Sequence, residues 1–337
     1  MIKSILEKLI EKADLTFNDA FGIMEEILNG RLNNSQLAGI LIALKMKGET
    51  PIEIAGFASA MRNYSIKINS NSENTIDVCG TGGDSSGSIN ISTAVAFVVA
   101  GTGIKVAKHG NRSITSYSGS ADVLEEMGIN INLTPSQSEK ALDTIGISFL
   151  FAPNYHPAMK YVSLVRKELG FKTVFNLLGP LTNPAGVKKQ LVGTYNYKSS
   201  ELLASAAQLL DFERVNFVCS NNSFDEISLS GEENAVFEFD NKNGQSKYFI
   251  NNETFGYPSF SNLLLTGKDA NYNASKILEL FEFKMKDALY YNVCANAAMA
   301  LYSAKYSENF NDCILAAEAS IESGAALDKV NKLRAFR

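Results

Sequence analysis

The sequence is poor in the residues that cross-link secreted proteins or bind transition metals. It contains two histidines, four cysteines and no tryptophan. The cysteines are far apart, form no CxxC motif and have no neighbouring histidine: Cys79, Cys219, Cys294 and Cys313. This spacing argues against disulfide or metal-binding roles, so we expect buried thiols in a reducing compartment.

The sequence also lacks an apolar run of the roughly 20 residues that a membrane crossing needs. Residues 1–15 alternate charged and apolar side chains at helical spacing, which does not fit a secretory signal. The formal net charge of −5 argues against a broad nucleic-acid-binding surface. We therefore expect a cytoplasmic protein with no membrane or nucleic-acid partner, in which local basic residues hold any anionic substrate.

What is present is an ordinary globular composition with two successive patterns. The 337 residues are 45% apolar and 20% charged, enough for two domains or for one large domain carrying a smaller one. The first pattern is purely helical. Thr16 with Asp19 resembles a capping box, Ser35 is expected to open a helix that ends at Gly48, and Thr50 precedes proline and a reciprocal glutamate. These signals predict a small helical domain.

The second pattern alternates strands with helices. The first strands are expected at 75–80, 104–110 and 147–153, and the intervening helices at 90–103, 118–128 and 134–146. After a proline- and glycine-rich interruption, the pattern resumes with strands at 190–195 and 215–220, a helix from about Ser200 to Leu210, and two long helices. The Asn/Ser-rich residues near 220 and at 241–253 are interpreted as turns. This alternation predicts a parallel sheet with helices on its faces.

A glycine-rich turn, Gly-Thr-Gly-Gly-Asp at 80–84, lies between a predicted strand and a helix that begins near Ser88 or Asn90. Glycines let main-chain N–H groups approach phosphate, and a helix N-terminus favours negative charge. The terminal aspartate fits a ribose phosphate better than bare phosphate, because it needs a sugar hydroxyl or a metal-bound water beside it. Ser92 and Thr93 add polar groups in the first helical turn. A tight turn with ordinary helix capping is the alternative interpretation.

A basic segment, Lys-His-Gly-Asn-Arg-Ser at 108–113, ends the next predicted strand. Ligands of α/β sheets bind at the carboxyl ends of parallel strands. Lys108 offers a point charge and Arg112 a planar fork, and both suit a polyanion. A solvated charged loop is the alternative, but it does not account for the run of polar residues that continues to Ser120.

Other candidate residues occur singly or in pairs. Asp225 and Glu226 follow a predicted strand and turn, where paired carboxylates could help hold Mg²⁺, although acidic pairs are also common on solvated turns. Arg166 lies in a predicted helix and could clamp a carboxylate, with a surface salt bridge as the alternative. His109 and His156 both follow strand ends, and neither is assigned as a general base.

Taken together, these segments resemble the anthranilate phosphoribosyltransferases. The shared motifs keep that family's order and spacing over nearly the whole chain: GTGGD, NIST, KHGNRS, SGSADVLE, HPAMK, VRKELG, TVFNLLGPLTNPA and the Asp-Glu pair. The combination of KHGNR with FNLLGPLTNPA is the specific part of the resemblance.

The resemblance implies an α/β fold of the nucleoside phosphorylase and phosphoribosyltransferase type. A small helical domain, residues 1–72 with the inserted segment 166–186, would lie beside a larger α/β domain, residues 73–165 and 187–337. The larger domain would have a mainly parallel central sheet flanked by helices and would bind phosphoribosyl pyrophosphate. Family members are commonly homodimers through the helical domain.

The resemblance also implies the site residues. The phosphoribosyl pyrophosphate contacts would be Gly80, Gly83, Asp84, Ser88, Asn90, Ile91, Ser92, Thr93, Lys108, His109, Gly110, Asn111, Arg112, Ser113, Ile114, Thr115, Ser116 and Ser120. The anthranilate contacts would be Gly80, Asn111 and Arg166. The ligands of Mg²⁺, expected as two ions, would be Ser92, Asp225 and Glu226. The catalytic residues would be Lys108, Asn111 and Arg166.

The chain departs from the family pattern at several positions. Where the family has a His-Gly pair and a glycine before Leu-Asp-Glu, this chain reads CSNNSFDE. Leu164 replaces a usual proline, Lys172 a usual arginine, and Tyr117 a common lysine. The first departure bears on the geometry and metal affinity of the turn that carries Asp225 and Glu226. Leu164 is expected to loosen a helix near the hinge that the resemblance implies between the two domains. None removes an expected ligand.

The implied reaction is a Mg²⁺-dependent pentosyl transfer in tryptophan biosynthesis, in which the amine of anthranilate displaces pyrophosphate from ribose. No dedicated base is required, because the aniline nitrogen is neutral at pH 7. A pyrimidine-nucleoside phosphorylase of the same fold is one alternative, which KHGNR and the Asp-Glu pair disfavour. A non-catalytic relative that binds nucleic acid is the other, which the acidic composition disfavours.

Overall fold

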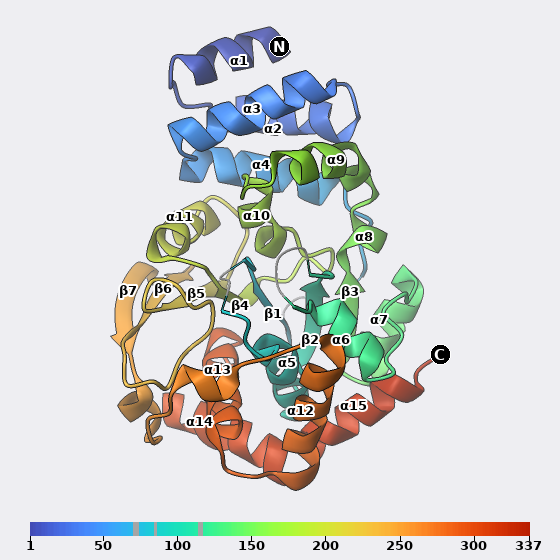
Figure 1. Ribbon diagram of the computed structural model, residues 1–337, viewed down its shortest axis with the longest axis vertical. Helices are drawn as coiled ribbons and strands as arrows, with labels where there is room; N and C mark the ends of the chain where they lie inside the picture. The colour runs from blue at the N-terminus through green and yellow to red at the C-terminus, as the bar shows by residue number, and fades with distance from the viewer. Residues whose placement is uncertain (70–73, 84–85, 114–116) are drawn as a thin grey trace.

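The computed structural model describes residues 1–69, 74–83, 86–113 and 117–337. Within these ranges, a helical bundle lies at one end of the molecule and a sheet with helices packed on it forms the remainder (Figure 1). The predicted fold class, a small helical region beside a larger α/β region, is confirmed. No helix in the described ranges combines the length and apolar character that a membrane crossing requires.

The N-terminal bundle begins its helices with side-chain caps. Its helices are α1 Ile2–Ile10, α2 Phe17–Leu28, α3 Asn34–Lys47 and α4 Pro51–Asn63. The capping boxes predicted at Thr16 and Thr50 are present. The prediction that Ser35 opens α3 was wrong, because the side chain of Asn33 accepts the N–H of Gln36 and caps the helix two residues earlier.

Two helices from the middle of the chain complete this end of the molecule. They are α9 Lys160–Leu169 and α10 Phe175–Leu178. Val165 and Phe175 belong to the same hydrophobic cluster as the buried residues of α2, α3 and α4. This packing places the chain around residues 160–178 against the bundle, and residue 166 lies inside α9 rather than between elements.

Seven strands in the described part of the chain form one sheet in the order β3-β2-β1-β4-β5-β6-β7. They are β1 Thr75–Gly80, β2 Lys105–Gly110, β3 Ile147–Phe151, β4 Lys189–Gly193, β5 Arg214–Ser220, β6 Asn234–Asp240 and β7 Gly244–Ile250. The pairs among β1 to β5 are parallel, whereas β5–β6 and β6–β7 are antiparallel. The sheet is therefore mainly parallel, as predicted.

The antiparallel hairpin of β6 and β7 was not predicted. Residues 241–253 were interpreted as a turn, but residues 244–250 are a strand. β7 is an edge strand whose side chains are mostly exposed. Without a buried face it has no reason to alternate apolar and polar residues, so its sequence reads as a loop.

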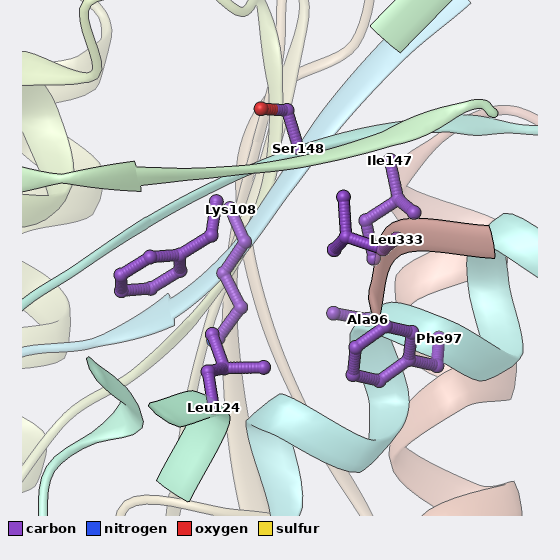
Figure 2. Close-up of a pocket in the computed structure, with 8 residues that line it drawn as sticks. Ala96, Phe97, Lys108, Leu124, Ile147, Ser148 and Leu333 are labelled. Carbon is purple, nitrogen blue, oxygen red and sulfur yellow. The ribbon is translucent and has the colours of Figure 1, made fainter. Parts of the chain in front are cut away.

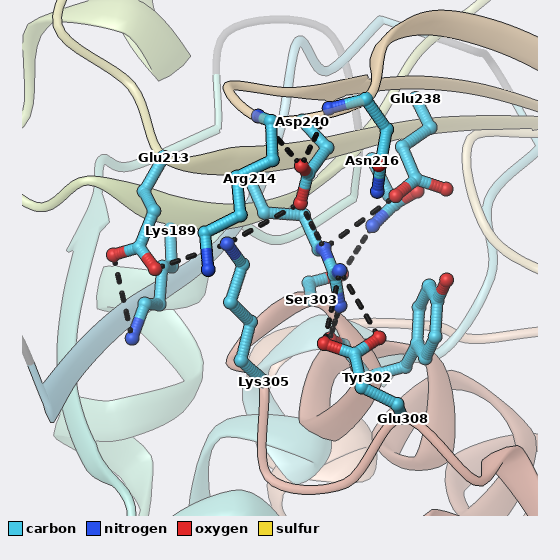
Figure 3. A network of polar contacts seen from close by, with 12 residues as sticks. Lys189, Glu213, Arg214, Asn216, Glu238, Asp240, Tyr302, Ser303, Lys305 and Glu308 are labelled. Carbon is cyan, nitrogen blue, oxygen red and sulfur yellow. Dashed lines mark hydrogen bonds and ion pairs between the residues drawn. The ribbon is translucent and has the colours of Figure 1, made fainter.

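A charged cluster ties this hairpin to β5 and to the segment after α13 Ala288–Ser303 (Figure 3). The guanidinium of buried Arg214 pairs with Asp240 at 2.8 Å and with Glu308 at 3.1 Å. Lys305 pairs with Glu213 at 3.0 Å and also with Asp240 at 3.3 Å. Each cation of this cluster thus has carboxylate partners inside the fold.

Helices cover both faces of the sheet. They include α5 Ile91–Gly101, α6 Ser120–Glu126, α7 Pro135–Thr144, α8 Ala152–Tyr155, α11 Tyr197–Ala207, α12 Ala270–Phe283, α13, α14 Phe310–Glu322 and α15 Ala325–Ala335. Nearly every residue of α5 and α13 is buried, and the two helices pack against each other. α11 begins three residues before the predicted Ser200, because Asn196 caps it.

Candidate active site

The candidate site is the edge of the sheet at which the parallel strands end. β1, β2, β4 and β5 end at residues 80, 110, 193 and 220, and their parallel pairing brings these ends to one side. This side faces the helical bundle (Figure 1). The glycine-rich turn, the basic segment and the turn with Asp225 and Glu226 therefore meet at this edge. The sequence had predicted a position after a strand for the glycine-rich turn and for the basic segment, each by a separate argument.

The glycine-rich turn has the backbone that its glycines predict. Gly82 and Gly83 adopt φ angles of +64° and +74°, which favour glycine. The N–H of Thr81 donates to Gly193 O at 2.8 Å and fixes the turn to β4. Gly83 O accepts a hydrogen bond from the ammonium of Lys172, which also lies 3.7 Å from the centre of the Tyr195 ring. The adjoining Asp84 lies outside the described residues.

The start of α5 supplies main-chain and side-chain groups to the same edge. The N–H of Ser92 donates to Glu226 Oε1 at 3.1 Å. Asn90 precedes the helix but does not cap it; its Oδ1 accepts from Ser118 Oγ at 3.0 Å and from Asn273 Nδ2 at 2.9 Å. Thr93 is buried, and its hydroxyl has no partner among the described residues.

Two other residues predicted to contact phosphoribosyl pyrophosphate, Ile91 and Ser88, do not present free side chains at the start of α5. Ile91 is fully buried, so only its main chain can meet a ligand. Ser88 forms a β-bridge with Thr266, ahead of the helix.

Lys108 is buried rather than displayed on a solvated loop. Together with Leu124 and Phe97 it lines a cavity of about 10 Å³ (Figure 2), which is too small for a substrate. The ammonium donates to Val78 O at 2.6 Å and to Ser92 Oγ at 3.3 Å. Burial lowers the pKa of Lys108, and nearby Asp77, Cys79 and Glu226 oppose that shift. The charge is thus fixed at the start of α5.

The two histidines, His109 of the basic segment and His156 after α8, lie side by side. Their ring centres are 5.2 Å apart, and both residues are buried. Burial lowers the pKa of His109 to about 3 and that of His156 to about 4. Both are therefore neutral at pH 7. The main-chain N–H of His109 donates to Asp77, whose own pKa burial raises to about 6. This geometry suits a packed support for the strand end better than a general base.

The loop after β2 is organised by acidic residues of α6. Arg112 pairs with Asp122 at 2.8 Å and with Glu125 at 2.5 Å, so its fork meets protein carboxylates. The N–H of Ser113 also donates to Asp122, at 3.2 Å. Asn111 O accepts from Ser120 Oγ at 3.3 Å.

Close packing limits which residues this loop can carry at position 110. A side chain at Gly110 would collide with Ser120. Residues Ile114, Thr115 and Ser116 lie outside the described residues.

Arg166 lies in α9, which packs with the helical bundle. Its guanidinium lies 5.3 Å from the centre of the Phe175 ring, and the residue is partly buried. Burial lowers the pKa of Arg166. No carboxylate in the described ranges forms an ion pair with Arg166. The described residues therefore do not support the alternative role of Arg166 in a surface salt bridge. A cation with an aromatic neighbour can accept the carboxylate of a ligand.

Asp225 and Glu226 point toward different parts of the edge. Asp225 Oδ2 lies over Gly80, where a Cβ atom would be only 3.1 Å away. Glu226 accepts the N–H of Ser92. Asn221 and Asn222 in the preceding turn adopt φ angles of +46° and +53°, a conformation that asparagine tolerates. The CSNNSFDE departure therefore still forms a turn that aims both carboxylates at the site.

The donor groups at this edge fit magnesium. The described residues contain no cluster of three or more His, Cys, Asp or Glu side chains that could enclose a metal. Two carboxylates, one at the start of α5 and one over Gly80, instead match an ion that keeps most of its coordination for water and phosphate oxygens. The oxygen-only donor set also disfavours zinc and other soft-ligand metals.

Comparison with known proteins identifies the class. Residues 3–65 match the family described as "Glycosyl transferase family, helical bundle domain", and residues 72–327 match "Glycosyl transferase family, a/b domain". The fold and these matches define a glycosyl transferase built from a helical bundle and an α/β domain.

The curated relatives narrow the class further. The chain is 42% identical to the anthranilate phosphoribosyltransferase of Thermoanaerobacter sp. (strain X514), over 100% of this chain and 99% of the relative. It is 41% identical to that of Alkaliphilus metalliredigens (strain QYMF), over 99% of this chain and 97% of the relative. The chain belongs to the anthranilate phosphoribosyltransferase family, which confirms the resemblance seen in the motifs.

Solved structures agree with this assignment. Anthranilate phosphoribosyltransferase from Thermus thermophilus superimposes with a TM-score of 0.92 at 34% identity, over 98% of both chains. The Saccharomyces cerevisiae enzyme in complex with PRPP and Mg has a TM-score of 0.89 at 27% identity, over 98% of this chain and 96% of that one. The yeast enzyme has also been solved with 4-fluoroanthranilate.

Two residues at this edge were not among the predicted site residues. Asn273 of α12 is buried and donates to both Asn90 Oδ1 and Ser118 Oγ at 2.9 Å, so it joins the glycine-rich segment to the basic loop. Lys172 was noted only as a departure from the family. A buried amide on an otherwise packed helix is a usable signal for Asn273, because such a group needs a partner.

Proposed function

We propose that this chain transfers the phosphoribosyl group of 5-phosphoribosyl 1-pyrophosphate to the amine of anthranilate, giving N-(5-phosphoribosyl)anthranilate and pyrophosphate in tryptophan biosynthesis. The observation that carries the proposal is a polyanion site at the strand-end edge, which faces the helical bundle (Figure 1). Lys108, the glycine-rich turn and the start of α5 offer the polyanion site, and Arg166, on a helix packed with that bundle, would offer a carboxylate site. The names of the relatives support the same pairing of substrates.

The donor would lie along the glycine-rich turn, the first turn of α5 and the basic segment. Lys108 would face its pyrophosphate, since the ammonium is held at Ser92. Because the Arg112 guanidinium pairs with carboxylates of α6, the residues next to it in the basic segment would bind the donor mainly through main-chain N–H groups. The remaining expected contacts in 80–93 and 108–120 keep their proposed roles, including Asp84 and residues 114–116.

Anthranilate would be oriented by Arg166, Asn111 and the exposed main chain of Gly80. Arg166 would meet the carboxylate, because its guanidinium has an aromatic face beside it and no ion pair with a described carboxylate. Fixing the carboxylate places the aniline nitrogen toward the ribose, and this positioning is the main contribution that the protein makes.

Ser92, Asp225 and Glu226 would hold Mg²⁺, proposed as two ions. When bound, the metal neutralises charge on the pyrophosphate and so assists its departure. A complex of the yeast enzyme with PRPP and Mg supports the use of magnesium.

The chemistry asks little of a base. The bond from the anomeric carbon to pyrophosphate oxygen breaks, the bond to the aniline nitrogen forms, and the substituted anilinium then loses its proton. Lys108 and main-chain N–H groups stabilise the negative charge of the leaving group. His109 and His156 are neutral and buried, which agrees with a mechanism that uses neither as a base.

We also place the chain in the cytoplasm as a homodimer formed through the helical domain, with 166–186 as part of that domain. Exposed apolar side chains on the bundle support such an interface, among them Ile10, Ile42 and Met46.

The decisive experiment follows the loss of anthranilate fluorescence with phosphoribosyl pyrophosphate and Mg²⁺. Omission of either the donor or the metal should stop the reaction. Phosphorolysis of a pyrimidine nucleoside with free phosphate, without anthranilate turnover, would instead support the nucleoside phosphorylase alternative.

A further inference from the structure

The turn that carries Asp225 and Glu226 is held by a side chain from a distant part of the sequence. Asn296 lies in the middle of α13 and is fully buried. Its Oδ1 accepts the N–H of Ile227 at 2.9 Å, and its Nδ2 donates to Ile227 O at 3.0 Å. One amide therefore satisfies both main-chain groups of the residue directly after Glu226, as a neighbouring strand would.

A second contact holds the turn from the other side. Ser220, the last residue of β5, is buried, and its hydroxyl is within hydrogen-bond distance of Glu226 O, at 2.5 Å, and of Asn234 Oδ1. The same hydroxyl accepts the N–H of Ser228 at 3.1 Å. The N–H of Ser220 also donates to Phe224 O at 2.9 Å, so the main chain on both sides of the carboxylate pair is bonded to the end of β5 or to α13.

Packing against β4 removes the remaining freedom of the turn. The main-chain carbonyl of Asp225 lies so close to Gly193 that any side chain at residue 193 would overlap it. With the main chain fixed, the side chains reach separate targets: Asp225 lies over Gly80 and Glu226 meets the N–H of Ser92. Neighbouring residues in a regular strand would point to opposite faces. The irregular turn is therefore what allows both carboxylates to face the same edge of the sheet.

We propose that Asn296 and Ser220 are positioning residues that set the magnesium affinity of the Asp225–Glu226 pair. The proposal rests on the metal-binding role of this pair under the proposed function. Mg²⁺ demands near-octahedral geometry, so a small displacement of its carboxylates weakens binding. Groups that orient metal ligands typically change affinity by about 10- to 100-fold when removed.

The same helix offers a matched control. Asn292 is one turn earlier in α13 and is equally buried, and its amide donates to Ala288 O within the helix. Asn292→Ala and Asn296→Ala remove the same group from the same helix. Only the second removes a contact with the carboxylate turn. Ser220→Ala removes a single oxygen atom and serves as an independent variant that perturbs packing little.

The test titrates each variant with Mg²⁺ at saturating substrates. A second readout uses electron paramagnetic resonance of Mn²⁺ bound to the enzyme with phosphoribosyl pyrophosphate and no anthranilate, in which no turnover occurs. Asn296→Ala and Ser220→Ala should raise the Mg²⁺ midpoint by about 10-fold or more and weaken Mn²⁺ binding similarly. High Mg²⁺ should restore most of the activity. Asn292→Ala should keep the wild-type midpoint, whatever its melting temperature.

Asp225→Asn combined with Glu226→Gln separates the possible failures. If this double variant raises the midpoint while Asn296→Ala and Ser220→Ala leave it unchanged, the positioning role is wrong and the proposed metal site stands. If the double variant also keeps the wild-type midpoint and Mn²⁺ affinity, both the metal site and the positioning role are wrong. If Asn296→Ala does not fold, the Ser220→Ala midpoint decides.

Discussion

The two ends of β5 lie beside two groups of charges that the protein uses in different ways. At the start of the strand, buried Arg214 pairs directly with Asp240 and Glu308 (Figure 3). Two cations assigned to the candidate site, Lys108 and Arg166, have neutral partners instead. Lys108 contacts a main-chain carbonyl and a hydroxyl, and Arg166 lies against an aromatic ring.

Burial alone does not separate a structural charge from a functional one, because Arg214 and Lys108 are equally buried at 3% exposure. The chemical nature of the partners does. A buried cation with carboxylate partners is already compensated within the fold, whereas one held by dipoles retains its attraction for an anionic ligand. The comparison predicts opposite consequences for substitutions at the two ends.

The largest effect is expected at the compensated end. Arg214→Ala leaves Asp240 buried without its main cation and should lower the free energy of unfolding by about 3–5 kcal/mol. The KM values of folded enzyme for both substrates should stay near those of the wild type. Urea unfolding with steady-state kinetics on the same preparation measures both. A stable variant with a raised KM would mean that the charged cluster is part of the site.

A smaller effect is expected from the buried histidines, which carry no charge at pH 7. The pKa of His156 is about 4 in the folded state and about 6.5 when unfolded, so the unfolded chain binds more protons between these values. Stability is full above about pH 6.5 and falls as the pH drops, by roughly 1–2 kcal/mol per histidine at pH 5.

The substitution His156→Phe isolates this contribution, because it keeps a ring but removes the titrating nitrogens. Unfolding at pH 7 and pH 5 should show a smaller loss of stability on acidification in the variant than in the wild type. Asp77 shifts in the opposite direction, with a raised pKa of about 6, but it is present in both proteins and cancels in the comparison. Equal losses in the two proteins would show that His156 is accessible to protons when folded.

The smallest effect is expected at Arg112, which combines features of both groups. It belongs to the predicted donor site, yet its exposed guanidinium already pairs with Asp122 and Glu125. Arg112→Ala should change stability by less than about 1 kcal/mol, as for other exposed ion pairs. It should also change the KM for the donor less than substitution of Lys108 does. Arg31→Ala, which removes another ion pair, at the end of α2, is the control for stability.

The sequence predicted those parts of the fold that depend on local signals. Capping boxes at Thr16 and Thr50 were visible because their partners lie three residues away. The parallel strands were visible as short buried runs between helices. Strand β7 was missed because an exposed edge strand has no apolar periodicity. Strand β6, which is buried along its whole length, was not predicted either, and exposure does not explain that omission.

The candidate site shows the same division. The composition of the glycine-rich and basic segments indicates phosphate binding, and each segment lies at a strand end where ligands bind. The partners of these residues could not be predicted, because contacts such as Asn273 to Asn90 and Asn296 to Ile227 join positions far apart in the sequence. The pairing of Arg112 with α6 and the burial of Lys108 likewise follow from the packing of whole elements.

The measurement that tests the difference between compensated and uncompensated charges most directly is the pair of KM values in Arg166→Ala and Lys108→Met. Arg166→Ala should raise the KM for anthranilate by about 10- to 100-fold and leave that for phosphoribosyl pyrophosphate nearly unchanged, because one charge-assisted contact is lost. Lys108→Met keeps the buried stem and should raise the KM for the donor or lower kcat, with little change in the KM for anthranilate. Equal changes for both substrates in both variants, matching a loss of stability, would contradict the account.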